Sequence, residues 1–162
     1  MRIIKLAIIS FVFLFLLITG ISLFIPSNVR ISKAINIKAE KDSLFALIQD
    51  TGKWYRWHPA YQQTHINTLQ NKIIITPLVS NDSLIAMQIN LPGKKLINSS
   101  WQVYHNSLRD SLTLQWYMDF NLKWYPWEKF SSLLYEEKYG TMMQTGLSNL
   151  KGITERPSIT FD

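Results

Sequence analysis

Residues 112–127, LTLQWYMDFNLKWYPW, decide the fold of this chain. Every second position is apolar, and mainly polar residues fill the gaps. Successive side chains of a strand point to opposite faces, so the alternation predicts one long strand with a continuous apolar face. A face of that width needs a cover, so we expect the sheet to curl over a helix or an apolar cavity. The face comprises Leu112, Leu114, Trp116, Met118, Phe120, Leu122 and Trp124.

Four earlier stretches have strand-like sequences, either alternating or rich in β-branched residues. Short polar turns separate the last three from one another and from the long strand. Consecutive strands joined by short turns indicate an antiparallel meander. The expected strands cover residues 29–38, 73–76, 85–91 and 97–104.

One helix is expected before the meander and one after it. Apolar residues recur at helical spacing in 40–50, EKDSLFALIQD, and the aromatic turn at 53–59, KWYRWHP, is expected to pack against that helix. The last helix, at 141–151, carries Met143 and Leu147 four residues apart, as amphipathic helices do. Its apolar side suits the curl of the sheet.

A further helix is expected between the long strand and the last helix, over residues 128–139. Phe130, Leu133 and Leu134 form its apolar side. Gly140 is expected to end it, because glycine destabilises helix interiors and is common at the C-terminal ends of helices.

The composition narrows the classes of protein to which the chain can belong. With 162 residues, one of whose ends is an apolar segment, there is room for one folded domain. The absence of cysteine excludes disulfide frameworks, thiol nucleophiles and cysteine metal sites. The net charge is +6, but the basic residues are scattered, whereas nucleic-acid binding requires a clustered basic face. We therefore expect no nucleic-acid partner.

The N-terminal segment is long and apolar enough to span a membrane. Residues 6–25, LAIISFVFLFLLITGISLFI, contain no charge and follow Arg2 and Lys5. As a helix they would extend about 30 Å, the thickness of the hydrocarbon layer. A cleaved signal peptide is the alternative, but its apolar core is shorter and no good cleavage site is present. The sequence therefore favours an uncleaved anchor.

The expected organisation follows from that anchor. Residues 1–25 form the transmembrane anchor, 26–28 a short linker, 29–153 the folded domain and 154–162 a C-terminal tail. Basic residues nearly balance across the apolar segment, but a short basic tail usually stays in the cytoplasm while a long following domain is translocated. We expect a single-pass protein of the bacterial inner membrane with its domain in the periplasm.

The order of strand, short helices, meander and C-terminal helix resembles the START-like, or polyketide cyclase-like (SRPBCC), superfamily. The resemblance covers roughly residues 29–153. Residues 35–48 followed by the aromatic turn at 54–59 look like the opening strand, helix and turn of that superfamily. Residues typical of its members anchored in bacterial envelopes are found at 100–101, 114–118, 124–130, 139–140 and 146–151.

This resemblance implies an α+β helix-grip fold, in which a curved antiparallel sheet wraps around a long C-terminal helix. It also implies an internal apolar cavity between them, which in this superfamily holds lipids, hormones, polyketides or other hydrophobic molecules. Function varies widely over one fold, so the ligand does not transfer. With the strand pattern, the resemblance makes these residues candidates for lining the cavity: Trp57, Met87, Trp101, Trp116, Met118, Phe120, Met143 and Leu147.

We therefore expect an anchored, monomeric domain that binds a hydrophobic small molecule or a lipid, with no cofactor, metal or catalytic residue. One alternative is a cyclase or hydratase-type enzyme acting in the same cavity, and another is a structural envelope protein with a filled core. Inward-facing ionisable residues would favour the enzyme. His58, His65 and His105 lack metal-ligand spacing and are expected in turns or at the surface.

Overall fold

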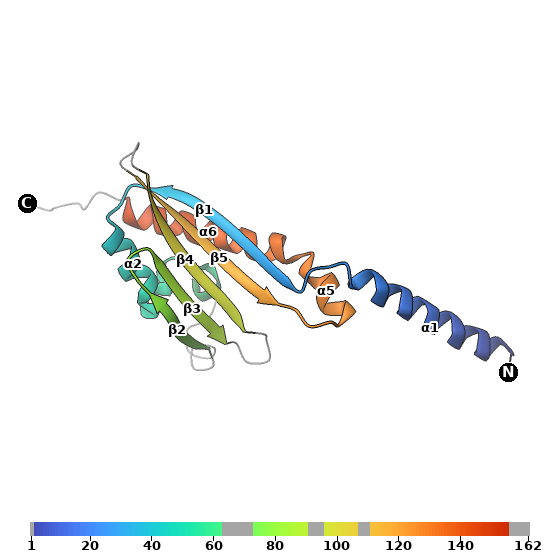
Figure 1. Ribbon diagram of the computed structural model, residues 1–162. Helices are drawn as coiled ribbons and strands as arrows, with labels where there is room; N and C mark the ends of the chain where they lie inside the picture. Colours follow the sequence, from blue (N-terminus) through green and yellow to red (C-terminus); the bar gives the residue numbers. More distant parts are fainter. Residues whose placement is uncertain (1, 63–72, 91–95, 107–110, 156–162) are drawn as a thin grey trace, which may run out of the picture. The chain divides into compact units, whose positions relative to one another are not determined.

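The structure, a computed structural model, describes residues 2–62, 73–90, 96–106 and 111–155 (Figure 1). The strands are β1 (Asn28–Ile37), β2 (Ile74–Ser80), β3 (Leu84–Asn90), β4 (Ile97–Asn106) and β5 (Ser111–Asn121). The α-helices are α1 (Arg2–Ser22), α2 (Lys41–Gln49), α3 (Pro59–Gln62), α5 (Pro126–Ser132) and α6 (Thr141–Thr154). A 3₁₀-helix, η1 (Thr51–Arg56), follows α2, and a π-helix, η3 (Glu136–Gly140), runs directly into α6.

The strands form one open sheet in the order β1-β5-β4-β3-β2. β2 to β5 pair antiparallel with their neighbours in sequence, as the short turns predict. β1 lies against β5, where Arg30 pairs with Asp119 and Asn36 with Thr113, so these two strands also run in opposite directions. The α+β class and the antiparallel sheet expected from the sequence are confirmed.

The even-numbered residues of β5 form its buried face, as the alternation predicts. Every even position of β5 from 112 to 120, and Leu122 directly after the strand, is at most 7% exposed, whereas the odd positions from 113 to 119 are only partly buried. Trp124 was expected on the same face, and this was wrong: the last backbone bond of this segment is that of Leu122 to Ser27, and Trp124, two residues later, is 61% exposed. The alternation of apolar and polar residues in the sequence continues past the last paired residue, so it does not show where the strand ends.

Helix α6 covers the buried face of the sheet (Figure 1). Met143, Gly146, Leu147 and Leu150 are its buried residues. Gly146 approaches the sheet so closely that a Cβ atom there would stand 2.9 Å from Cζ3 of Trp116. The helix-grip arrangement expected from the sequence is thereby confirmed.

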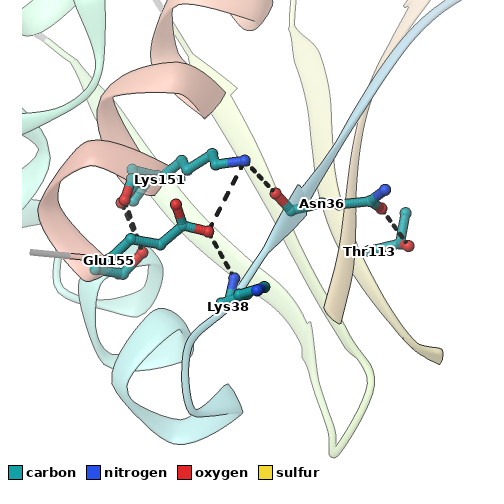
Figure 2. A network of polar contacts seen from close by, with 7 residues as sticks. Asn36, Lys38, Thr113, Lys151 and Glu155 are labelled. Carbon is teal, nitrogen blue, oxygen red and sulfur yellow. Dashed lines mark hydrogen bonds and ion pairs between the residues drawn. The ribbon is translucent and has the colours of Figure 1, made fainter. Parts of the chain in front are cut away.

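The C-terminal end of α6 is fastened to the end of β1, as Figure 2 shows. Nζ of Lys151 donates to the carbonyl oxygen of Asn36 at 3.0 Å. The backbone N–H of Lys38 donates to Oε1 of Glu155 at 2.7 Å, and that oxygen lies 3.8 Å from Nζ of Lys151. Asn36 also accepts from the hydroxyl of Thr113 on β5 at 2.8 Å. These bonds hold one end of the covering helix against the sheet.

Gly140 does not end a helix, contrary to the sequence-based expectation. Its backbone is right-handed helical, with φ −61° and ψ −43°, and η3 passes through it into α6. A Cβ atom there would stand 3.0 Å from Cε of Lys33 and 3.1 Å from Oε1 of Glu136. The glycine at position 140 therefore allows close packing beside the Lys33–Glu136 ion pair, and it does not end a helix.

The chain divides into two compact units. The sheet unit comprises residues 30–120 and 136–162, and the α1–α5 unit comprises residues 1–29 and 121–135. Within the α1–α5 unit, Nζ of Lys129 on α5 donates to the carbonyl oxygen of Ile25 at 2.7 Å and to the hydroxyl of Ser27 at 2.8 Å. The N–H of Leu122 donates to the carbonyl oxygen of Ser27 at 2.7 Å.

Candidate functional site

Six aromatic side chains meet in the interior of the sheet unit. They come from η1 and the residues directly after it, from α3, and from the neighbouring interior strands β4 and β5. Trp101 and Trp116 are register partners on those strands, and their rings stack with centroids 5.3 Å apart. We call this set the aromatic cluster: Trp54, Trp57, His58, Tyr61, Trp101 and Trp116.

The aromatic turn at 53–59 is tied to α2, as its sequence predicts. Nε1 of Trp54 donates to the carbonyl oxygen of Ile48 at 2.7 Å, and Nε1 of Trp57 donates to that of Leu47 at 3.2 Å. The last carbonyl groups of a helix lack partners within it, and here two indoles satisfy two of them. The backbone of Trp57 in turn accepts a hydrogen bond from Nδ2 of Asn149 on α6 at 3.0 Å.

The imidazole of His58 is an unusual member of this cluster. It is 2% exposed and stacks on Trp54 with ring centroids 5.2 Å apart. Burial lowers the pKa of His58 from 6.5 to about 4, so the side chain is neutral at pH 7. Nδ1 accepts a hydrogen bond from the N–H of Ala60 at 3.3 Å, which leaves the proton of the neutral ring on Nε2.

Three polar atoms of the aromatic cluster are buried without a hydrogen-bond partner among the described residues. They are Nε2 of His58, the hydroxyl of Tyr61 and Nε1 of Trp101. The contrast with the other tryptophans is informative, since Nε1 of Trp116, which is just as buried, donates to the hydroxyl of Ser99 at 2.7 Å. Burial raises the pKa of Tyr61 to about 12, so its phenol is also neutral.

Surface hollows adjoin the part of the sheet unit that the structure describes. One of about 350 Å³ reaches the cluster at Tyr61 and is also lined by Thr51, Gly52, Ile73 and Ile75. A second of about 820 Å³ is lined by Lys41 and Asp82, which form an ion pair at 3.0 Å, and by apolar side chains that include Val103 and Leu112.

Comparison with protein-family models gives no match, and comparison with curated proteins gives none either. Solved structures do match. A START superfamily protein from Mycobacterium smegmatis is 14% identical, and the match covers 78% of this chain and 97% of that one with a TM-score of 0.56. The fold is START-like.

Two other matches agree with this fold. The di-domain ARO/CYC StfQ from the steffimycin biosynthetic pathway is 10% identical, with a TM-score of 0.59 over 79% of this chain and 51% of that one. The chain thus spans about half the length of StfQ. The protein XoxI from Bacillus cereus is 15% identical, with a TM-score of 0.53 over 78% of this chain and 95% of that one. Identities this low establish the fold and leave the envelope-anchored subgroup a prediction.

All eight candidate cavity residues of the START-like domain are buried. None is more than 5% exposed, and none lines either of the two hollows described above. Three of them belong to the aromatic cluster, and the rest lie on β3, β5 and α6. The candidates are Trp57, Met87, Trp101, Trp116, Met118, Phe120, Met143 and Leu147.

Sequence reasoning did not nominate Trp54, His58 or Tyr61. His58 was expected in a turn or at the surface; it does follow η1, but it is buried. His105 is exposed, and His65 lies outside the described residues. A local signal was present, because residues 54–61 contain five aromatic or imidazole side chains, more than a surface turn of that length requires. Among the described residues, no group of three histidine or acidic side chains could hold a metal ion.

Proposed function

We propose that this chain is a membrane-anchored START-like domain that binds a hydrophobic small molecule or a lipid. The observation that carries the proposal is the set of three unpartnered polar atoms in the aromatic cluster. A buried polar group without a partner costs about 1 to 3 kcal/mol, so native proteins rarely keep one unless something else satisfies it. A polar atom of an otherwise apolar ligand would do so.

The chemistry of these atoms defines the ligand further. The N–H groups of His58 and Trp101 are donors only, and the hydroxyl of Tyr61 can also donate. Donors call for an acceptor oxygen on the ligand. The described members of the cluster are all uncharged at pH 7, and burying a carboxylate beside them would be costly. We therefore expect an uncharged acceptor, such as a ketone, quinone or ester carbonyl.

The fold supports the same proposal. Structures with this fold include a START superfamily protein and an ARO/CYC protein of a biosynthetic pathway. The eight candidates are buried residues of the sheet, of α6 and of the turn after η1, and the superfamily resemblance implies a ligand cavity between the sheet and α6. We infer a binding role rather than a catalytic one, because the ring partners of His58 are aromatic side chains that offer no second acid or base at pH 7.

The anchoring part of the proposal rests on α1. Among the described residues, α1 is the helix that is long and apolar enough to cross a membrane, and no residue of its most apolar stretch is buried. A secretion signal would have similar length and composition. The inner-membrane location, the periplasmic domain and the monomeric state are parts of this proposal.

Ligand binding is tested by measuring probe affinity and unfolding free energy together. The detergent-solubilised chain is titrated with an environment-sensitive aromatic ketone, for wild type, Trp116→Ala and Met143→Ala. We expect wild type to bind and both variants to bind more weakly than their lost stability explains. If the wild-type chain binds no apolar probe, and Trp116→Ala merely loses about 3 to 5 kcal/mol of stability, the domain has a filled core instead.

That second function, a structural envelope domain, is favoured by the close packing of Gly146 against Trp116. Trp101→Phe separates the two functions, since it removes one unpartnered N–H and keeps a ring. In a binding domain, this substitution should weaken binding of the ketone and leave binding of its hydrocarbon analogue unchanged. In a filled core, it should raise stability, because the buried donor without a partner is gone.

A further inference from the structure

The α1–α5 unit exposes apolar and aromatic side chains directly after α1 and around α5. Phe130, Leu133 and Leu134, which form the apolar side expected for the helix at 128–139, are 36%, 63% and 64% exposed. Tyr125 stacks on Trp127 with ring centroids 4.8 Å apart and contacts Trp124 at 4.9 Å. On the surface that follows α1 and surrounds α5, these large apolar side chains are more than 60% exposed: Leu23, Phe24, Trp124, Trp127, Leu133 and Leu134.

The contacts of Lys129 fix this surface at one end of α1. Helical turns continue past Ser22, because the N–H groups of Phe24 and Ile25 donate to Ile21 and Ser22. Lys129 is only 4% exposed, and its ammonium group caps the last carbonyl of that turn, that of Ile25. A cation at a helix C-terminus is favourable both for the free carbonyl and for the helix dipole. α5 is therefore held at the level where the apolar segment ends.

That level has a distinct chemistry if α1 spans a bilayer. A helix that crosses the hydrocarbon layer ends among the lipid headgroups, and tryptophan and tyrosine are enriched at that depth because their rings are apolar and their N–H or O–H groups are polar. Trp124, Tyr125 and Trp127 have this character. Lys123, whose ammonium group lies 5.9 Å from the ring of Tyr125, adds a positive charge that suits anionic headgroups.

We propose that α5 and the aromatic residues before it lie in the lipid–water interface and form a second membrane contact beside α1. This inference rests on the anchoring proposed above. The occupant of the exposed surface is the bilayer, because a spanning α1 brings lipid to the very turn that Lys129 caps. The contact also fixes how α1 and α5 lie in the membrane, since both belong to one compact unit.

Tryptophan fluorescence can test this inference, since the chain has six tryptophans and only Trp124 and Trp127 are exposed. The full chain is reconstituted in vesicles of phosphatidylcholine and phosphatidylglycerol, with bromine placed either near the headgroup or near the end of the acyl chain. We expect stronger quenching by the bromine near the headgroup. The double variant Trp124→Phe/Trp127→Phe should lose most of this quenching, and each single variant part of it, with an unchanged circular dichroism spectrum.

Carbonate extraction of the same vesicles separates this inference from the anchoring proposal. If the protein stays in the membrane and the double variant is quenched as strongly as wild type, the interface inference is wrong and the anchor stands. If Trp124 and Trp127 are quenched by aqueous acrylamide equally with and without lipid, they face water or a protein partner, and the inference is again wrong. Release of the chain by carbonate would overturn both proposals.

Discussion

A single missing methyl group sets how closely α6 approaches the sheet. At Gly146 a Cβ atom would stand 2.9 Å from Trp116 and 3.3 Å from Cδ of Pro59. Trp116 is held by its bond to Ser99, and proline is rigid, so neither neighbour can retreat easily. We predict that Gly146→Ala lowers the unfolding free energy by about 1 to 3 kcal/mol, as measured by chemical denaturation.

Gly152 offers a matched control on the same helix, since nothing lies within 4 Å of a Cβ atom there. Gly152→Ala should be neutral or stabilise by up to about 1 kcal/mol, through helix propensity alone. Equal stability of the Gly146→Ala variant and wild type would contradict the prediction. It would also mean that Trp116 has free space to move into, as an internal cavity would provide.

His58 should make stability depend on pH. Its pKa is about 4 in the folded chain and 6.5 in the ordinary side chain, so the unfolded state binds more protons between these values. Stability is therefore complete above pH 6.5 and is lost as the pH falls toward 4. One pKa unit corresponds to about 1.4 kcal/mol, so the loss attributable to His58 is roughly 3 kcal/mol by pH 4.

Denaturation of wild type and His58→Asn at pH 7 and at pH 4 checks this prediction. The asparagine oxygen can replace Nδ1 as an acceptor but does not titrate, so the variant should lose less stability on acidification. His105→Asn removes an exposed imidazole and should keep the wild-type dependence. Identical pH profiles for wild type and His58→Asn would refute the assignment.

At the scale of elements, the bonds in Figure 2 hold the end of α6 to β1. Oε1 of Glu155 accepts a hydrogen bond from the backbone N–H of Lys38. The same oxygen forms an ion pair with Nζ of Lys151 at 3.8 Å. We predict that Glu155→Ala costs about 0.5 to 1.5 kcal/mol of stability, whereas Glu155→Gln, which keeps an acceptor, costs less. Because a partly exposed ion pair contributes little to stability, screening it by raising the salt concentration should change the unfolding free energy little. A glutamine variant as unstable as the alanine variant would show that charge dominates.

Elements also differ in how far their sequences reveal them. The alternation of β5 and the helical spacing of α2 and α6 directly specify which face is buried, because each period belongs to one backbone geometry. The segment between β5 and α6 misled the same reasoning. Its apolar spacing indicates a helix but does not say what the apolar side meets, and Gly140 gives the same local signal whether it ends a helix or lets a neighbour approach.

At the scale of the whole molecule, the anchor makes a direct prediction. The chain expressed in bacterial cells should remain in the membrane pellet after carbonate extraction, because α1 is long enough to span and lacks a convincing cleavage site. N-terminal sequencing should find the first residues still present. A soluble form that begins near Ile21 would identify α1 as a signal peptide.

The sequence by itself determined the class of this fold, the antiparallel meander, the buried face of β5 and the helix that covers it. Local periodicity sufficed for these features, since a strand or helix with one apolar face has few ways to bury it. Those features also led to the START-like resemblance, which the structural comparisons confirm.

Only the tertiary structure brought the aromatic cluster together. Its members come from three separate parts of the sequence, residues 54–61, Trp101 and Trp116, and no local pattern tells which indole N–H will find a partner. The end of α1 and Lys129 are likewise far apart in sequence and are joined by a single ammonium group. Hydrogen bonding depends on the positions of individual atoms, which are fixed only once the elements have packed, whereas burial of a face depends on the repeat along one element.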